Sequence, residues 1–592
     1  MVRRVSAGCD SLRSMAARQT EWLISKRAAV AEHGMVTAMH PLAAAAGLEI
    51  LEHGGNAVDA AVATAFAIGV VEPAMSGLGG VAGMVIYLAA TGQTVTVDGS
   101  SVAPAAARDD TFALDAASGV AGMYGWPATR DDAQNTGYRA PVAPGQPACL
   151  LYAHARFGSG RLSRADVLAP AIRLAAEGFD VDTYQAQTIA FAQRRLRAFP
   201  ETMRAYFLSD GTPPAPASLT HAADRLVQSD LAESLRALAE HGPAALYTGE
   251  LGERLIADLQ AHGGLLTRAD LAAFKVRESA PGLTTDYRGY QLVGLSPASG
   301  SPTAFEMLHI VQACDLADLE ADSAQAVHLV AEACRAAFQD RFAHLADPTQ
   351  QEVPIAGLLS TAYAAERARG IDRDRARPDA VAGDPWAFQP AELVGATRQP
   401  GKPAGDGCTT HINVVDTERN AVALTSTLGE SFGSGVVASG TGILLNNGMT
   451  WFDPRPGRMN SIQPGRRTLW APTPTLVLQA GRPVLAIGAP GGRRIMSAVA
   501  QSLLNVLRWG EDVQTAVSAP RIHAEGPTTE IDSRYGPEII DNLRERGHQV
   551  RVIDEDSASF RFARPCGIAL DWRTGLLTGG VHQFTPAWAM GY

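Results

Sequence analysis

The segment around Thr409 constrains the fold and chemistry of this 592-residue chain most strongly. Residues 408–416 read Cys-Thr-Thr-His-Ile-Asn-Val-Val-Asp, and residues 421–428 read Ala-Val-Ala-Leu-Thr-Ser-Thr-Leu. Both runs are rich in β-branched residues, which predicts two neighbouring strands with a threonine at the head of the first. A threonine hydroxyl is a weak nucleophile unless a base lies beside it, and the threonine's own α-amine is one such base. That amine is free only if the chain is cut before the threonine.

The stretch before this strand has a different composition. Residues 372–407 are rich in Pro, Gly, Asp, Arg and Lys and show no sustained periodicity, which predicts an exposed and mobile segment. The segment leads directly into Cys408-Thr409. A flexible tether before a buried strand is what a self-cleaving junction requires, because the new chain end must move away after the cut.

Bulk properties exclude several classes of function. The net charge of -11 argues against a nucleic-acid-binding protein, which needs a basic face. The six cysteines are scattered, with neither zinc-ligand spacing nor the density of a disulfide framework, so a reduced compartment is the simplest inference. The sequence shows no metal-ligand cluster and no cofactor motif, and we therefore expect neither a metal nor a cofactor.

The apolar segments predict neither a secretory signal nor a membrane span. Arg3 and Arg4 are not followed by an apolar run, because Ser11–Lys26 is polar. The most apolar helix candidate, Ala57–Val71, contains Asp59 and is shorter than the roughly 20 residues that a span needs. We therefore expect a cytoplasmic protein with no membrane partner.

The remaining chain alternates between helical and strand-like patterns. Residues 1–33 read as a poorly ordered leader, and regular patterns begin at Gly34. Apolar periodicity predicts helices over 57–71, 164–179, 225–262, 324–345, 493–508 and 536–547. It predicts strands over 84–88, 94–98, 411–416, 421–428, 473–479 and 484–488. We expect sheet layers covered by helices, built as one intertwined domain.

Several short motifs occur along the chain in the order found in a known protein family. They include Gly54-Gly55-Asn56-Ala57-Val58-Asp59, Val71-Glu72-Pro73, Tyr247-Thr248-Gly249, Tyr287-Arg288-Gly289-Tyr290, Thr409-Thr410-His411, Gly442-Ile443-Leu444-Leu445-Asn446-Asn447 and Gly488-Ala489-Pro490-Gly491-Gly492. From about Gly34 to the C-terminus, the series resembles the γ-glutamyltransferase (γ-glutamyltranspeptidase) family of N-terminal nucleophile hydrolases. The resemblance implies an α+β fold, an αββα sandwich of two antiparallel sheets between helical layers.

The resemblance also implies roles for individual residues. The precursor would cut itself between Cys408 and Thr409 into a large subunit, residues 34–408, and a small subunit, residues 409–592. Thr409 would be the nucleophile in that cut and again in turnover, with its freed amine, of reference pKa roughly 7.7–8.0, as the base. Thr427 would orient the nucleophile. Gly491 and Gly492 would form the oxyanion hole, where losing one donor costs about 3 kcal/mol.

Each of these residues also has a plainer reading when taken alone. A Thr-Thr pair in a strand is usually a matter of β-propensity, and Gly-Gly before a helix is usually a turn. His411 reads as a packed, hydrogen-bonded histidine, and Cys408 as incidental. Residues 76–83 are Gly-rich but follow a helix and lack a P-loop Lys-Ser/Thr, so we reject a nucleotide loop. The ordered occurrence of all the motifs favours catalysis for Thr409.

The predicted substrate pocket departs from the family pattern. Family members that act on γ-glutamyl compounds hold the amino-acid head group with an arginine, an asparagine, an acidic pair and two serines. The matching positions here are Ser100, Gly429, Gly448, Trp451, Trp470 and Ala471. A buried charged head group without partners costs several kcal/mol, so this pocket is predicted to disfavour a free glutamyl zwitterion. The arginines that remain as candidate carboxylate holders are Arg466, Arg467, Arg493 and Arg494.

Three hypotheses follow. The first is a self-processed N-terminal threonine hydrolase that forms an acyl-enzyme at Thr409 with a small-molecule acyl substrate. Relatives in antibiotic pathways, including those that remove an acyl fragment from alkylproline precursors by C–C cleavage, are one comparison. The second is a conventional γ-glutamyltransferase or glutathione hydrolase. The third is an inactive, single-chain binding homologue. The expected partners are the two subunits of one precursor, and whether the cleaved protein forms a homodimer stays open.

Overall fold

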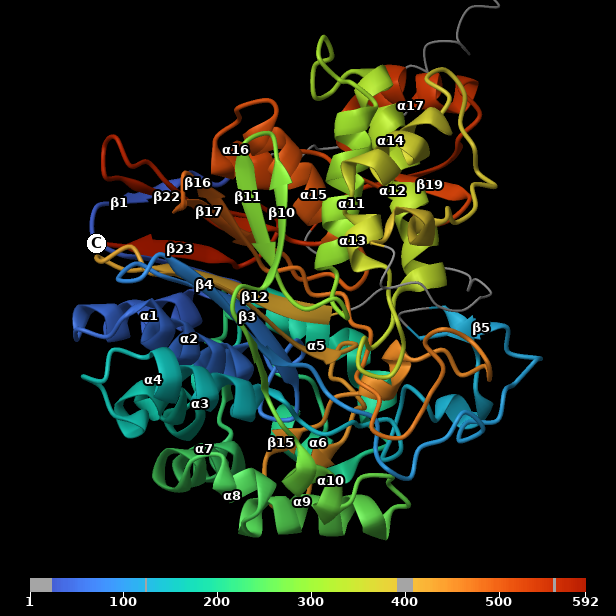
Figure 1. Cartoon of the computed structure of the whole chain (residues 1–592). Helices are drawn as coiled ribbons and strands as arrows, with labels where there is room; N and C mark the ends of the chain where they lie inside the picture. The colour runs from blue at the N-terminus through green and yellow to red at the C-terminus, as the bar shows by residue number, and fades with distance from the viewer. Residues whose placement is uncertain (1–23, 123–124, 391–407, 557–560) are drawn as a thin grey trace, which may run out of the picture.

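Two stacked antiparallel sheets lie between layers of helices (Figure 1). This computed structural model describes residues 24–122, 125–390, 408–556 and 561–592. Each sheet has seven strands, in the order β23-β2-β12-β13-β3-β4-β9 in one and β1-β22-β21-β17-β16-β11-β10 in the other. Every neighbouring pair in both sheets is antiparallel. The αββα sandwich expected from the sequence is confirmed.

The first sheet carries the predicted nucleophile. Its strands are β2 (Met35–Ala38), β3 (Val81–Leu88), β4 (Gln93–Gly99), β9 (Arg277–Ser279), β12 (Cys408–Val415), β13 (Ala421–Gly429) and β23 (Trp588–Gly591). Its outer face packs against helices from the N-terminal half of the chain. The helices of this half are α1 (Pro41–Glu52), α2 (Ala57–Val71), α3 (Gln146–Phe157), α4 (Arg164–Glu177), α5 (Thr183–Leu196), α6 (Pro200–Tyr206), α7 (Ser229–His241), α8 (Ala244–Tyr247), α9 (Glu250–Ala261) and α10 (Arg268–Ala273).

The second sheet is covered by the remaining helices. Its strands are β1 (Ala29–Ala31), β10 (Leu283–Tyr287), β11 (Tyr290–Gly294), β16 (Thr475–Gln479), β17 (Arg482–Gly488), β21 (Cys566–Leu570) and β22 (Leu577–Val581). The helices are α11 (Ser301–Ala313), α12 (Ala324–His344), α13 (Ile355–Leu358), α14 (Thr361–Arg369), α15 (Arg494–Leu507), α16 (Val513–Ser518) and α17 (Gly536–Glu545). A small sheet of β18 (Ile522–His523), β19 (Thr528–Asp532) and β20 (Gln549–Ile553) flanks this layer.

Helix α2 runs antiparallel to β12 and is held at both ends. Asn56 caps its first turn in a capping box with Asp59, and every residue of the helix is buried. The backbone N–H of Ala57 donates to Asp416 Oδ2, just beyond the end of β12, at 2.8 Å. Glu72, directly after the helix, lies at the other end of the strand, beside Thr410. The helix therefore supports β12 along its whole length.

Most predicted helices are confirmed, and one expectation needs correction. Residues 225–262 were expected to form one long helix, but they form the short strand β8 (Arg225–Leu226) followed by α7, α8 and α9. The break follows from Gly242, whose φ of 65° ends α7, and from Pro243, which has no N–H to continue the hydrogen-bond ladder. Helix α2 spans the predicted residues 57–71, and α12, α15 and α17 lie where the periodicity placed them.

Two segments predicted to be unstructured are partly ordered. Residues 29–31, inside the predicted leader, form β1 and pair with β22, so the leader boundary at residue 33 is too late. The segment 372–390 is anchored as well, because Trp386 is buried and the N–H of Gly383 donates to Asp340 Oδ1 at 2.7 Å. Residues 1–23 and 391–407 lie outside the described residues. No helix among the described residues has the length and apolarity needed to cross a membrane.

Candidate active site

Thr409 lies in an irregular step at the head of β12. Cys408 pairs with Gly429 of β13 and Thr410 pairs with Ser426, so Thr409 falls between two registers. Such a bulge re-aims the side chain that it contains. Thr409 and Thr427 are buried, each 2% exposed. Strand β12 therefore begins at Cys408, and its pairing with β13 is irregular at Thr409.

A chain of hydrogen bonds joins the two threonines to the peptide bond before Thr409. The Thr409 hydroxyl donates to Thr427 Oγ1 at 3.3 Å, and the Thr427 hydroxyl donates to the carbonyl oxygen of Cys408 at 2.6 Å. The N–H of Gly429 also donates to Thr427 Oγ1, at 2.9 Å. A hydroxyl has one proton and two lone pairs, and all three are used at Thr427. Its proton is therefore directed at the carbonyl of Cys408.

Gly491 and Gly492 form the loop between β17 and α15. Gly491 has φ 139° and Gly492 has φ 60°, conformations that favour glycine. A Cβ on Gly491 would lie 2.5 Å from the Cα of Ala563, so the neighbouring chain leaves no room for a side chain. The backbone N–H of Arg564, two residues before β21, donates to the carbonyl of Pro490 at 2.9 Å and so connects the loop to the start of that strand. The oxyanion role of the two glycines stays a prediction.

His411 is a structural histidine. Its Nδ1 lies 2.8 Å from Thr425 Oγ1 and its Nε2 lies 3.0 Å from Asn413 Oδ1. Burial lowers the pKa of His411 to about 3, so the ring is neutral. Its ring packs against Gly488 of the facing sheet, where a Cβ would approach within 2.2 Å. Burial also raises the pKa of the Cys408 thiol to about 11, which disfavours a thiolate nucleophile.

The predicted substrate-pocket residues fall into connected groups. The rings of Trp451 and Trp470 meet edge to face at 6.5 Å, in the core between the two sheets. A Cβ on Gly448 would lie 2.9 Å from Trp451 Cζ3, so the small residue and the large ring fit together. A Cβ on Gly429 would lie 2.1 Å from Asn447 Oδ1. The six positions are all buried: Ser100, Gly429, Gly448, Trp451, Trp470 and Ala471.

Arg467 occupies the space beside Ser100. It donates to the carbonyl of Ser100 at 2.5 Å and to the carbonyl of Lys275 at 2.6 Å. Arg466 likewise donates to main-chain carbonyls, those of Met459 and Ser461. These two arginines connect loops around the predicted pocket.

The other two candidate carboxylate holders are already paired. Arg493 contacts Glu525 at 2.7 Å and Arg494 contacts Glu530 at 2.8 Å. Because each guanidinium faces a protein carboxylate, neither is available as the main partner of a substrate carboxylate in this arrangement.

Three buried residues near Thr409 were given no role in the site from the sequence, although Glu72 lies in the motif Val71-Glu72-Pro73. Arg564 Nη2 lies 3.4 Å from the carbonyl oxygen of Thr409, and its Nη1 donates to the hydroxyl of Tyr184. Glu72 Oε1 lies 3.7 Å from Arg564 Nη1. Burial raises the pKa of Glu72 to about 7, against the opposing effect of Arg564. No sequence motif connects positions 72, 184 and 564, and only the fold brings them together.

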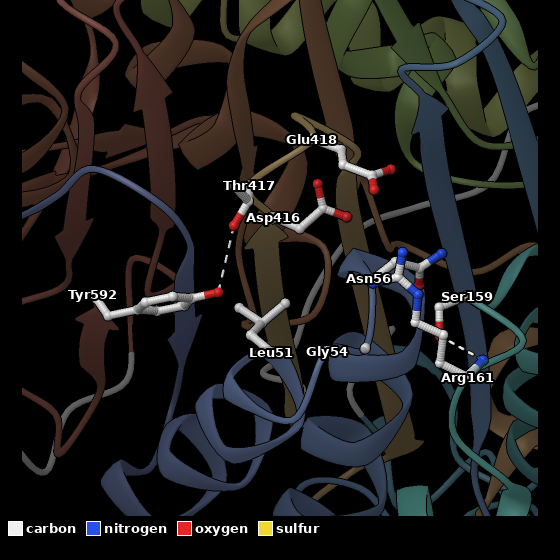
Figure 2. Close-up of a pocket in the computed structure, with 10 residues that line it drawn as sticks. Leu51, Gly54, Asn56, Ser159, Arg161, Asp416, Thr417, Glu418 and Tyr592 are labelled. Carbon is white, nitrogen blue, oxygen red and sulfur yellow. Dashed lines mark hydrogen bonds between the residues drawn. The ribbon is translucent and has the colours of Figure 1, made fainter.

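A polar pocket of about 310 Å³ lies at the opposite end of β12 from Thr409 (Figure 2). It is bordered by Asn56 at the start of α2, by Asp416 and Glu418 after β12, and by Tyr592, whose hydroxyl faces Thr417 Oγ1 at 3.5 Å. The whole of β12 separates this pocket from Thr409. It therefore lies outside the predicted catalytic centre.

One group of three described side chains has the spacing of a metal site. The ligand atoms of His328, Glu332 and His548 lie within 4.8 Å of one another. The two rings already contact each other, however, with His328 Nδ1 2.8 Å from His548 Nε2, and Glu332 is paired with Arg335. Each group thus has a protein partner, and we assign no metal to this cluster.

Comparison with known proteins identifies the class. A family model of gamma-glutamyltranspeptidases matches residues 43–575. Among curated proteins, the chain is 38% identical to the acylase ACY 1 proenzyme of Pseudomonas sp. (strain SE83) over 535 residues, covering 90% of each chain. It is 34% identical to the glutathione hydrolase proenzyme of Escherichia coli (strain K12), covering 88% of this chain and 86% of that protein.

Solved structures agree with the sequence relatives. The cephalosporin acylase from Bacillus halodurans has a TM-score of 0.81 to this chain at 28% identity, covering 98% of this chain and 99% of that one. The fold and the family match show an N-terminal nucleophile hydrolase. The chain belongs to the γ-glutamyltranspeptidase family. Within it, the chain resembles both acylases and glutathione hydrolases.

Proposed function

We propose that this chain is a precursor that cuts itself between Cys408 and Thr409, and that Thr409 then removes an acyl group from a small molecule other than a free γ-glutamyl compound. The hydrogen-bond chain Thr409–Thr427–Cys408 carries the first half of this proposal. It aligns a hydroxyl nucleophile and a polarised carbonyl at one peptide bond. That relatives of both named activities are proenzymes supports the same cut.

Self-cleavage begins with attack of the Thr409 hydroxyl oxygen on the carbonyl carbon of Cys408. The new C–O bond forms an ester, the C–N bond between Cys408 and Thr409 breaks, and the hydroxyl proton ends on the departing amine. The hydrogen bond from Thr427 to the Cys408 oxygen stabilises the charge that develops there. Water then hydrolyses the ester, which leaves Cys408 as a carboxyl terminus and Thr409 with a free α-amine. The subunits become residues 34–408 and 409–592, together with the preceding leader.

Turnover repeats the same chemistry on a substrate. The free amine accepts the proton of the Thr409 hydroxyl as the oxygen attacks the acyl carbon. The N–H groups of Gly491 and Gly492 hold the developing oxyanion, and the leaving group takes the proton from the amine. Water, or another acceptor, then releases the acyl group from Thr409. These reaction steps require neither a metal ion nor a cofactor.

The pocket favours an acyl group without an amino-acid head group. Trp451 and Trp470 stand at two of the positions where the family resemblance places polar head-group residues, both are buried in the core between the sheets, and Gly448 packs against Trp451. Arg493 and Arg494 already face protein carboxylates, so neither is the main partner of a glutamyl carboxylate. A glutamyl ammonium group would also be buried here without a carboxylate at position 448 or 451 to balance its charge, which is costly. The similarity to the ACY 1 acylase supports an amide-type acyl substrate.

Three matched anilides test this assignment. γ-Glutamyl-p-nitroanilide carries both head-group charges, glutaryl-p-nitroanilide lacks only the ammonium, and butyryl-p-nitroanilide lacks both. We expect kcat/KM to be lowest for the γ-glutamyl compound, by about 100-fold or more, given the cost of an unpaired buried charge. Preference for the γ-glutamyl compound would instead identify a conventional γ-glutamyltransferase. A chain that binds the compounds but neither cuts itself nor releases nitroaniline would be the inactive binding homologue.

Narrower features of the proposal rest on sequence patterns and on the family resemblance. We place the enzyme in the cytoplasm and in a biosynthetic pathway for an antibiotic or similar compound, with C–C acyl cleavage of an alkylproline-type precursor as one reaction that the same nucleophile supports. The partners are the large and small subunits of one precursor, which form a heterodimer. Two such heterodimers can associate into a homodimer. Metabolite analysis of a strain lacking the gene, together with the solution mass of the cleaved protein, tests these points.

A further inference from the structure

Residues 563–564 connect the two halves of the predicted catalytic centre. The backbone N–H of Arg564 donates to the carbonyl of Pro490, directly before Gly491, and Ala563 packs against Gly491 itself. The side chain of the same arginine reaches the carbonyl oxygen of Thr409, with Nη2 at 3.4 Å. One residue therefore contacts both the nucleophile and the loop predicted to hold the oxyanion.

The arginine is buried in a closed set of partners. Arg564 is 4% exposed, and its guanidinium also contacts Glu72 at 3.7 Å, the Tyr184 hydroxyl, and Met75 Sδ at 3.7 Å. Tyr184 comes from α5 and Glu72 from the end of α2, so both lie in the predicted large subunit. Thr409 and Arg564 lie in the predicted small subunit. The cluster thus connects the two predicted subunits next to the main chain of Thr409.

From this geometry we propose that Arg564 is a positioning residue for Thr409, with Glu72 as its buried counter-ion. It fixes the Thr409 main chain relative to the Gly491 loop, and its positive charge favours the neutral, base-competent form of the freed α-amine. The proposal rests on the proposed function, because it takes Thr409 as the nucleophile. It assigns to Arg564, Glu72 and Tyr184 a role in that same site that the sequence motifs do not contain.

The charges around the future amine define the expected pH behaviour. Arg564 is the cation nearest Thr409 in this cluster, and the groups that face it are Glu72, Tyr184 and the thiol of Cys408. Asp182 also faces Glu72, and Glu430 faces Cys408. Like charges within a few ångströms lower the pKa of an amine, and opposite charges raise it. Removing Arg564 should therefore raise the amine pKa, while removing the Glu72 charge should lower it.

Opposite pH shifts in two variants provide the test. Arg564→Met and Glu72→Gln are made in the full chain, and self-cleavage is followed by SDS gel from pulse-labelled precursor. After cleavage is complete, the acylation burst with p-nitrophenyl acetate is recorded against pH. We expect Arg564→Met to slow self-cleavage at least 10-fold and to move the acid limb of the burst upward by about one pH unit. Glu72→Gln should move the same limb downward, and Arg564→Lys should restore its position.

A matched control separates positioning from general destabilisation. Arg335 is equally buried and pairs with Glu332, but its other partners are the carbonyl of Gly526 and Thr529 Oγ1, away from Thr409. Arg335→Met should leave the cleavage rate and the acid limb of the folded protein unchanged.

Each outcome has a definite meaning. Unchanged cleavage and an unchanged acid limb in both Arg564→Met and Glu72→Gln would overturn the proposal, as would shifts of the same sign. If Arg564→Met fails to fold, Glu72→Gln still decides the sign, and an acid limb that stays or moves upward in that variant would overturn the proposal. Absence of any cut at Cys408/Thr409 in the unmodified chain would instead refute the proposed function on which the inference rests.

Discussion

The hydroxyl of Thr427 lies 2.6 Å from the carbonyl oxygen of Cys408, and it is held there by two donors, the Thr409 hydroxyl and the N–H of Gly429. The residue assigned from sequence as an orienting group thus also contacts the carbonyl that the proposed self-cleavage attacks. One side chain on β13 therefore contacts both groups on β12 that would react in the proposed cut.

Replacing Thr427 should slow self-cleavage without stopping it. Thr427→Val keeps the shape of the side chain but removes the donor to Cys408, and a hydrogen bond to a developing charge is worth about 1.5–3 kcal/mol. The expected loss in rate is roughly 10- to 100-fold, measured by SDS gel on newly made precursor. Thr427→Ser keeps the hydroxyl and should recover most of the rate. Equal rates for Val and Ser would show that the hydroxyl has no part in the cut.

Gly491 should not tolerate a side chain. Gly491→Ala would place a Cβ 2.5 Å from Ala563 Cα, at a φ of 139°, so the loop must move and the predicted oxyanion donors with it. Loss of one such donor costs about 10²–10³ in kcat. Gly481→Ala is the matched control, because Gly481 has φ 76° but no heavy atom within 4 Å of its Cβ position. It should cost about 1 kcal/mol of stability and leave turnover intact. A similar loss of turnover in both variants would contradict the assignment.

Trp451 should affect acyl selectivity and leave self-cleavage unchanged. The hydrogen bonds at the Cys408–Thr409 bond involve neither Trp451 nor Trp470. Trp451→Leu removes an aromatic ring that packs edge to face against Trp470 at one of the predicted substrate-pocket positions, so we expect a loss of about 10-fold in kcat/KM for the preferred anilide, a cost of roughly 1.4 kcal/mol. The extent of self-cleavage should match that of the unmodified chain. Equal losses in cleavage and turnover would indicate a folding defect instead of a recognition role.

Glu72 should make the protein less stable as the pH rises. Burial raises the pKa of this carboxyl from 4.5 to about 7, so its neutral form prevails in the folded state below about pH 7, and above that pH the carboxylate is the counter-ion of Arg564. A raised carboxyl pKa contributes stability that is complete below about pH 4.5 and is lost as the pH rises to about 7. Relative to Glu72→Gln, the unmodified chain should lose at most about 3 kcal/mol across that window. Calorimetric Tm values of the two proteins at pH 5 and 7.5 measure the difference. A gap in Tm that does not change with pH would contradict this interpretation.

The sequence alone predicted the parts of the fold that local pattern determines. Helix α2 was predicted to the residue because Asn56 and Asp59 cap it and Glu72-Pro73 ends it. Strand β12 was predicted from its β-branched residues, although its start was placed at residue 411 and lies at Cys408. The break at Gly242-Pro243 was passed over because apolar periodicity continues on both sides of it.

The parts of the site that depend on distant contacts were not predicted. Nothing in the local sequence around Arg564 indicates that its side chain meets Glu72, Tyr184 and Thr409, since these positions are separated by hundreds of residues in the chain. Gly448 and Trp451, in contrast, are only three residues apart in the chain. The position of the Trp451 ring nevertheless depends on its contact with Trp470, which comes from another loop. Long-range packing decides such contacts, and sequence periodicity carries no information about them.

The intact mass of the purified chain under denaturing conditions shows directly whether the protein cuts itself at Cys408/Thr409. We expect two fragments whose masses join at that bond, the smaller one beginning with an unmodified threonine, and a single uncut chain for Thr409→Ala. A single 592-residue species after long incubation, or normal cleavage of Thr409→Ala, would contradict this expectation.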